Sequence, residues 1–175
     1  MRFAGRFFEE EKTDYFIFGA VAMNLWIPPR TTANIDAALC VDKRRARQLV
    51  EKLRVNRFNI TPTLAGRLLK CRRVTVRAGE SDLDLKLAVS DHEREALARS
   101  RVFKAEDFKL RIAVPEDLVL LKLQSWRLQD RADIERLWKT RRDLDVPYIT
   151  SWLERLEEFA GSPMTARWNE IRGGP

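Results

Sequence analysis

The chain has 175 residues, 45% of them hydrophobic and 34% charged, which is typical of a globular protein of one domain and argues against a disordered chain. Its formal charge of +7 favours nucleotides and nucleic acids as partners. No apolar stretch approaches the length of a membrane span, and the first residues lack the apolar core of a signal peptide, so we expect a cytoplasmic protein with no membrane partner.

The first part of the sequence predicts helices and strands that alternate, because short apolar runs follow amphipathic stretches. Gly19 and Ala20 predict a tight turn, Asp42 is positioned to cap a helix, and Gly79 and Glu80 predict a hairpin turn. The predicted elements are a helix over 3–12, a strand over 15–18, a helix ending at Ile27, a strand over 34–41, helices over 43–54 and 62–70, strands over 74–77 and 83–88, a helix over 91–100 and an edge strand over 108–114.

The remainder of the sequence predicts helices only. They span residues 115–126, 130–141, 146–159 and 164–172, and the first is apolar on more than one face, which indicates a central position. The expected fold class is therefore α+β, with a small mixed β-sheet, flanking helices and a helical C-terminal half. We expect one compact unit in which residues 1–114 form the α/β core and residues 115–175 pack on it.

Polar side chains alternate with apolar ones along two of the predicted strands. Asn34 and Asp36 point the same way, toward the turn at Gly19, because successive side chains of a strand face opposite sides. Asp84 supplies a further carboxylate, whereas Asp82 fits equally well as a solvated residue at the start of its strand. Oxygen ligands grouped beside a glycine turn predict a site for a metal ion and its bound phosphates.

The cysteine and histidine content excludes some other chemistries. Cys40 and Cys71 lack neighbouring ligands at the spacing of a metal site, so we expect buried thiols. His92, the single histidine, lies at a predicted helix start where a solvated side chain is expected. A histidine-dependent catalytic triad is therefore hard to assemble.

Two groups of residues resemble motifs of the minimal nucleotidyltransferases, in particular of the AbiEii-like toxin family. The first motif runs from a glycine turn through Arg-x-Thr-x-Asp-hydrophobic-Asp, and it departs from the family at Ala20, often a serine there, and at Asn34, an aspartate there. The matching residues of this motif are Gly19, Arg30, Thr32, Ile35 and Asp36. The second motif is a helix that begins at a proline and supplies a lysine, followed by Arg-x-x-Asp-x-x-Asp. Its residues are Pro115, Glu116, Asp117, Leu118, Lys122, Arg127, Asp130 and Asp133.

The resemblance implies a nucleotidyltransferase-like fold and a set of site residues. Asp36 and Asp84 would be the catalytic carboxylates and the ligands of Mg²⁺ or Mn²⁺. The nucleoside triphosphate would contact Gly19, Ala20, Arg30, Asn34, Lys122 and Asp130. The implied reaction moves a nucleoside monophosphate onto RNA, with tRNA favoured by the basic surface, or onto a protein. The implied biological role is that of a toxin with an antitoxin protein as its partner.

Asn34 leaves the activity open, because an amide offers one neutral oxygen where the family has a carboxylate. The lost charge could weaken a divalent metal site by several kcal/mol. The sequence therefore predicts nucleotide binding with one metal ion and slow or absent transfer. The alternative is a noncatalytic module on the same fold that binds nucleic acid or a protein.

Structural roles compete with several of these assignments. Arg30 could pair with a carboxylate and fix its loop instead of reaching a phosphate, and Lys122 could extend from an apolar helix into solvent. Asp130 and Asp133 fit the cap and the third position of a helix. Four tryptophans at helical spacing are expected in the core, namely Trp126, Trp138, Trp152 and Trp168.

Overall fold

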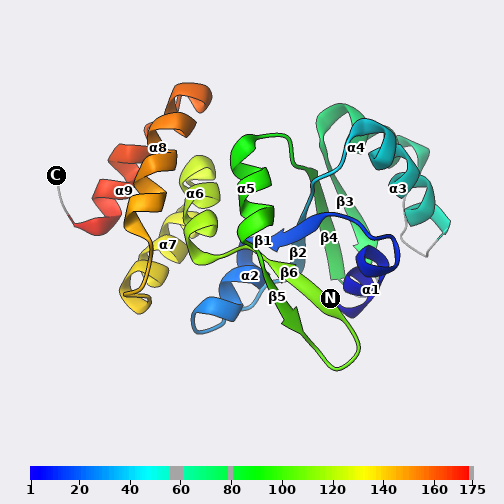
Figure 1. The fold of residues 1–175 in the computed structure, drawn as a ribbon, viewed down its shortest axis with the longest axis horizontal. Coiled ribbons are helices and arrows are strands. Elements are labelled where there is room, and N and C mark those ends of the chain that lie inside the picture. The colour runs from blue at the N-terminus through cyan, green and yellow to red at the C-terminus, as the bar shows by residue number, and fades with distance from the viewer. Residues whose placement is uncertain (56–60, 79–80, 174–175) are drawn as a thin grey trace. The chain divides into compact units, whose positions relative to one another are not determined.

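The computed structural model describes residues 1–55, 61–78 and 81–173, which divide into two compact units. The first unit comprises Met1–Val21 and Arg30–Ala113, and the second comprises Ala22–Pro29 and Val114–Pro175. The first unit holds all the strands drawn in Figure 1, and the second is helical.

The first unit contains helices and strands in alternation. Its elements are α1 (Arg2–Glu10), β1 (Tyr15–Phe18), β2 (Asn34–Leu39), α3 (Lys43–Val55), α4 (Pro62–Cys71), β3 (Arg73–Ala78), β4 (Ser81–Leu87), α5 (Asp91–Arg99), β5 (Arg101–Lys104) and β6 (Lys109–Ile112). Helix α2 (Gly19–Trp26) begins in this unit, and its residues from Ala22 onward belong to the second unit. The second unit continues with α6 (Pro115–Ser125), α7 (Leu128–Thr140), α8 (Val146–Ala160) and α9 (Met164–Arg172).

The strands of the described chain form one sheet of six, in the order β3-β4-β2-β1-β6-β5. The sheet is mixed, because β2 pairs in parallel with β4 and antiparallel with β1, while β1 pairs in parallel with β6. This mixed sheet with its flanking helices confirms the predicted α+β class.

The two faces of the sheet differ because polar and apolar residues alternate along the strands. In β4, Leu83, Leu85 and Leu87 are buried, whereas Asp82 and Asp84 on the opposite face are partly exposed. Helix α4 packs on β3 and β4, and α3 packs on α4 (Figure 1). The polar face of the sheet, which carries the predicted site, is therefore the face away from α4.

Helices α3 and α4 form where the sequence predicts them. Asp42 caps α3, because its carboxylate accepts a hydrogen bond of 2.7 Å from the backbone N–H of Arg45. Thr61 caps α4 in the same way, and Pro62 occupies the first helical position. The predicted inward residues of α3 are all buried, namely Ala46, Leu49, Val50 and Leu53.

The second unit is arranged around α6, which packs on α7, α8 and α9. Leu118, Leu120 and Leu123 of α6 are at most 1% exposed, which confirms the predicted central helix. Trp168 is buried and packs edge-on against Trp138 at 5.5 Å. Trp126, Trp138 and Trp152 are partly exposed, so the expectation that all four tryptophans lie in the core is wrong for these three.

Two strand positions and one predicted turn differ from the sequence predictions. The predicted edge strand over 108–114 is β6, and it lies between β1 and β5 rather than at an edge. The edge position belongs to β5, a short strand of four residues that the sequence did not predict and that is mostly exposed. The predicted turn at Gly19 and Ala20 is the first turn of α2, since the helix follows β1 directly.

Two predicted exposures are also wrong. His92 is 3% exposed, because the first turn of α5 lies against the body of the first unit rather than in solvent. Cys71 is exposed at the last position of α4, and Cys40 is only partly buried. The predicted hairpin turn at Gly79 and Glu80 lies outside the described residues.

Within the part of the chain that the structure describes, no helix combines the length and the apolar character needed to cross a membrane.

Candidate functional site

Strand pairing brings the predicted polar residues of the first unit together. Asp36 lies opposite Phe18 of β1 and opposite Asp84 of β4 in the strand register. Asn34 lies two residues before Asp36 and therefore on the same face. Neighbouring strands are about 4.8 Å apart, so the side chains of Asn34, Asp36 and Asp84 occupy one small area of the sheet.

Gly19 places the start of α2 directly against this area. Its φ of +69° is in the left-handed region, and a Cβ added at this position would lie 2.0 Å from Oδ2 of Asp36. Only a glycine permits both this backbone conformation and this approach. The carboxylate of Asp36 thus lies beside the first residue of α2, and the positive end of the helix dipole favours an anion there.

Asp84 is held by neutral donors on both sides. The amide nitrogen of Asn34 donates a hydrogen bond of 3.1 Å to Oδ2 of Asp84, and the hydroxyl of Thr75 in β3 donates to Oδ1. An aspartate at position 34 would place a like charge where the amide donates. Asn34 therefore removes a negative charge from the site and also fixes the remaining carboxylate of β4.

Charged residues flank Asp84 along the same face of β4. Asp82 is partly exposed and pairs with Arg77 of β3 at 3.3 Å. Lys86 lies 2.5 Å from Oε1 of Glu93, and its ammonium is 5.9 Å from the centre of the Phe18 ring. Strand β4 lies between β3 and β2, so Asp84 is on an inner strand, and its side chain is partly exposed.

Glu93 holds Lys86 beside the site, a role that was not predicted from the sequence. Its Oε2 accepts hydrogen bonds from the backbone N–H groups of Val89 and Ser90 and from the Ser90 hydroxyl, which leaves Oε1 for Lys86. Burial alone would raise the pKa of Glu93, but the charge and hydrogen bond of Lys86, together with the backbone hydrogen bonds from Ser90 and Val89, lower it. The sequence carried a signal for this arrangement, since Ser-x-x-Glu before a helix is a capping box.

Arg30 and Thr32 lie in the loop before β2. The Arg30 guanidinium donates to the carbonyl oxygen of Thr31 at 3.3 Å, and the Thr32 hydroxyl donates to the carbonyl oxygen of Asn34 at 3.4 Å. Thr32 thus steadies the start of the strand that carries Asn34 and Asp36. Ala20, the next residue of α2 after Gly19, is buried.

Lys122, Asp130 and Asp133 form a buried ion cluster within the second unit. The Lys122 ammonium donates to Asp130 at 3.0 Å and to Asp133 at 2.8 Å, and all three residues are at most 7% exposed. The prediction that Lys122 could extend into solvent is therefore wrong. Because Lys122 belongs to α6 and both acids belong to α7, the cluster ties these helices together.

Neighbouring side chains donate further hydrogen bonds to the two carboxylates of the ion cluster. Arg127 and Ser125 donate to Oδ2 of Asp130 at 2.8 and 2.9 Å, and Gln129 donates to Oδ1 of Asp133 at 3.2 Å. Although burial would raise the pKa of Asp130, the hydrogen bonds from Arg127 and Lys122 lower it to about 2. Asp130 also accepts from the backbone N–H of Arg127, as predicted for a helix start, whereas Asp133 lies in the next turn of α7, beyond its capping positions.

The donors on the polar face suit one hard divalent cation. Asp36 and Asp84 supply carboxylate oxygens from neighbouring strands, and Mg²⁺ takes one or two carboxylates together with water and phosphate oxygens. Among the described residues, no three His, Cys, Asp or Glu side chains are grouped as a metal site. The set that fits is thus a pair of carboxylates beside the amide of Asn34.

Several solved structures resemble this chain in fold. The antibiotic-resistance factor ANT(2'')-Ia in solution has a TM-score of 0.51 and 15% identity, covering 88% of this chain and 89% of that chain. The lincosamide antibiotic adenylyltransferase LnuA, bound to lincomycin, has a TM-score of 0.51 and 16% identity, covering 78% and 92%. An antigenic nucleotidyltransferase-like protein from Paracoccidioides brasiliensis has a TM-score of 0.53 and 16% identity, covering 99% and 90%.

These likenesses show that the chain has the fold of nucleotidyltransferases. No family model and no curated protein matches the sequence.

Proposed function

We propose that this protein binds a nucleoside triphosphate together with Mg²⁺ or Mn²⁺ and transfers the nucleoside monophosphate slowly to RNA. The observation that carries the proposal is the register pairing of Asp36 with Asp84, beside Gly19 at the start of α2. The nucleotidyltransferase fold supports it, and so does the basic character of the chain, which favours a polyanionic acceptor.

The residues of the first unit have distinct tasks in this proposal. Asp36 and Asp84 hold the cation. Gly19 lets the Asp36 carboxylate lie against the start of α2, whose positive end favours the phosphate groups. Asn34 and Thr75 hold the carboxylate of Asp84 in place. When bound, the cation would neutralise negative charge on the triphosphate and on the departing pyrophosphate.

The proposed reaction is a displacement at the α-phosphorus. The oxygen of an RNA hydroxyl forms a new bond to this phosphorus, and the bond between the phosphorus and the bridging oxygen of the β-phosphate breaks. Pyrophosphate leaves with that electron pair. The hydroxyl proton passes to Asp84, which lies on the side of the site next to the edge strand β3.

A second candidate function is a noncatalytic module that binds nucleic acid or a protein through the same fold. The hydrogen bond from Asn34 to Asp84 favours it, because a neutral donor here replaces a charge that would hold a cation.

From the resemblance to AbiEii-like proteins we also propose a toxin neutralised by an antitoxin partner. A role of Lys122 and Asp130 in nucleotide binding stays a prediction from that resemblance, beside their contacts within the second unit.

Labelled nucleoside triphosphates, Mg²⁺ or Mn²⁺ and total RNA test the proposal. We expect slow labelling of RNA by the natural chain and none by Asp36→Asn. Asn34→Asp restores a carboxylate, so transfer and Mn²⁺ affinity should each rise at least about tenfold, a change of about 1.4 kcal/mol. Mn²⁺ should also raise the melting temperature of Asn34→Asp more than that of the natural chain, because bound metal relieves the repulsion from Asp84.

Asn169→Asp, the same chemical change on α9, is the matched control and should alter none of these readouts. If Asn34→Asp gains neither transfer nor metal affinity, the metal-dependent proposal fails. Tight nucleotide or RNA binding without transfer in every variant would support the noncatalytic module instead.

A further inference from the structure

Positive charge is concentrated in one part of the first unit. Residues 43–77 contain twelve Lys or Arg and one acidic residue, Glu51, although the whole chain has a formal charge of only +7. The rest of the sequence is therefore net acidic. This segment includes α3, α4 and β3, and α4 packs on both α3 and β3.

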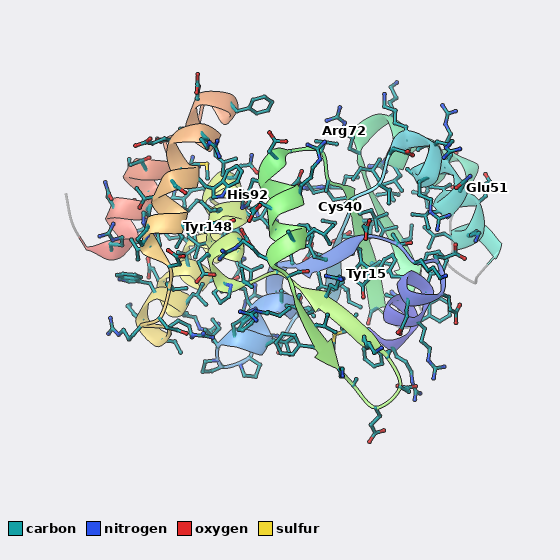
Figure 2. All side chains as sticks on the ribbon, in the orientation of Figure 1. Tyr15, Cys40, Glu51, Arg72, His92 and Tyr148 are labelled. Atoms are coloured by element: carbon teal, nitrogen blue, oxygen red, sulfur yellow. The ribbon has the colours of Figure 1, made fainter. Side chains whose placement is uncertain are left out.

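The basic residues of this segment are at the surface. We define the α3–α4–β3 face by six exposed side chains: Arg44, Arg47, Arg67, Lys70, Arg73 and Arg77. Figure 2 shows side chains with nitrogen ends projecting outward around α3 and α4, and Arg72 is labelled where α4 meets β3.

The charges on this face are not balanced locally. Among residues 1–55, 61–78 and 81–173, no carboxylate forms an ion pair with Arg44, Arg47, Arg67, Lys70 or Arg73. Arg77 pairs with Asp82 at 3.3 Å, and both side chains are substantially exposed, so the pair is weak and can exchange for a phosphate.

Arg73 and Arg77 lie on the polar face of the sheet, away from α4, so the α3–α4–β3 face reaches the candidate site around the edge strand β3. Arg73, Thr75 and Arg77 alternate along this edge strand, and all three are exposed. Thr75 donates its hydroxyl to Asp84, and Arg77 and Arg73 lie opposite Asp82 and Lys86 in the register. Two arginines thus flank the residue of β3 that touches the site.

The extent of the face selects a polymer rather than one nucleotide. Helix α4 alone is about 15 Å long at 1.5 Å per residue, and the charges continue onto α3 and β3. A polynucleotide presents phosphates at repeated intervals and gains affinity from the counterions that they release. Lysines and arginines also protect edge strands from aggregation, but that role does not account for the charges on the two helices.

We infer that the α3–α4–β3 face binds the phosphate backbone of the acceptor RNA and that β3 leads the end of the RNA to Asp84. This inference rests on the proposed function and assigns the acceptor to a particular surface of the first unit.

Fluorescence anisotropy with a labelled single-stranded RNA, without nucleotide or metal, tests the inference at several salt concentrations. Arg67→Gln combined with Lys70→Gln should weaken binding about five- to tenfold at moderate salt and reduce the slope of log K against log salt by about 1.4, which is 0.7 for each phosphate that the variant no longer neutralises. Adding Arg73→Gln should reduce both further. Arg67→Lys should retain binding, because charge rather than shape is required.

Arg101→Gln combined with Lys104→Gln is the matched control, since both are exposed basic residues on β5, the opposite edge of the same sheet. The control should keep the affinity and slope of the natural chain. Equal losses in the two double variants, or no RNA binding at low salt, would overturn the inference. Equal affinity for polyglutamate would overturn it in favour of an acidic protein partner, and tighter binding of DNA of the same sequence would overturn the assignment to RNA.

Nucleotide binding is measured separately with a fluorescent triphosphate and Mn²⁺. Loss of RNA binding with intact nucleotide binding supports the surface assignment. RNA binding to this face without nucleotide binding would leave the assignment standing and remove the proposed transfer reaction. Melting temperatures of all variants identify any that fail to fold.

Discussion

Asn34 differs from an aspartate by one amide group, and this difference changes both charge and hydrogen bonding in the site. The amide nitrogen donates to Asp84 at 3.1 Å, so the carboxylate has a partner without a cation. Two adjacent carboxylates would instead repel one another until a cation or a proton intervened. The identity of this residue therefore decides between a site that depends on metal and one that is satisfied by its own side chains.

Asp130 gives a residue-scale prediction about acid stability. Its folded pKa of about 2 is below the ordinary 3.8, so its charged form stabilises the fold above about pH 4, and this contribution is lost as the pH falls toward 2. The size of the effect is about 2 kcal/mol. Asp130→Asn should lower the free energy of unfolding by at least that amount at pH 7, because it leaves Lys122 with one carboxylate. Its stability should depend less on pH between 4 and 2.

Asp143→Asn is the control for this prediction. The hydrogen bond from Arg141 lowers the pKa of Asp143 to about 2 as well, but Asp143 is 67% exposed at its side chain. Water screens such a pair, so we expect no measurable change in urea denaturation at either pH. If the two variants behaved alike, the assignment of acid stability to the buried cluster would be wrong.

At the scale of elements, the junction of β1 and α2 depends on Gly19. An alanine would have to adopt a φ of +69° and would place its Cβ 2.0 Å from Oδ2 of Asp36. The backbone conformation alone costs about 1–2 kcal/mol, and the overlap must displace either Asp36 or the start of α2. Gly19→Ala should therefore destabilise the protein in urea denaturation and abolish Mn²⁺-dependent nucleotide binding.

Gly66→Ala is the matched control for that substitution. Gly66 lies within α4, where an added Cβ would meet no atom within 4 Å. Alanine is preferred to glycine inside a helix, so this variant should gain about 0.5–1 kcal/mol and keep nucleotide binding. A stable Gly19→Ala protein with normal nucleotide binding would contradict the role given to the junction.

At the scale of the whole molecule, the chain passes between the two units more than once. Ala22–Pro29 belongs to the second unit, although the residues on both sides belong to the first. Met23 and Ile27 of this segment are 1% and 6% exposed. A cut after Ala113 therefore separates these side chains from the helices of their own unit.

We expect a fragment of residues 1–113 to aggregate, because it would expose Met23 and Ile27. Size-exclusion chromatography should show large species, and Met23→Gln with Ile27→Gln should shift part of the fragment to the monomer. A monomeric, cooperatively folded fragment without these substitutions would show that the first unit does not need the rest of the chain.

Most helices and strands, and the grouping of the polar residues, could be predicted from the sequence. The run at Tyr15–Phe18 and the alternation around Asp36 and Asp84 specify strands through local periodicity, and Gly19 at the start of α2 specifies a turn of the backbone. Strand β5 and the inner position of β6 were missed because pairing partners are set by contacts distant in sequence. The burial of His92 and the pairing of Lys122 with Asp130 and Asp133 were missed for the same reason.

The sequence by itself determined the α+β class, the residue types available to bind a cation and phosphates, and the concentration of basic residues, since all of these depend on local pattern and composition. Only the tertiary structure decided that Asn34 donates to Asp84, that Glu93 holds Lys86 and that Asp130 and Asp133 enclose Lys122. Hydrogen bonds and ion pairs act over about 3 Å, and only the packing of strands and helices brings such residues within that distance.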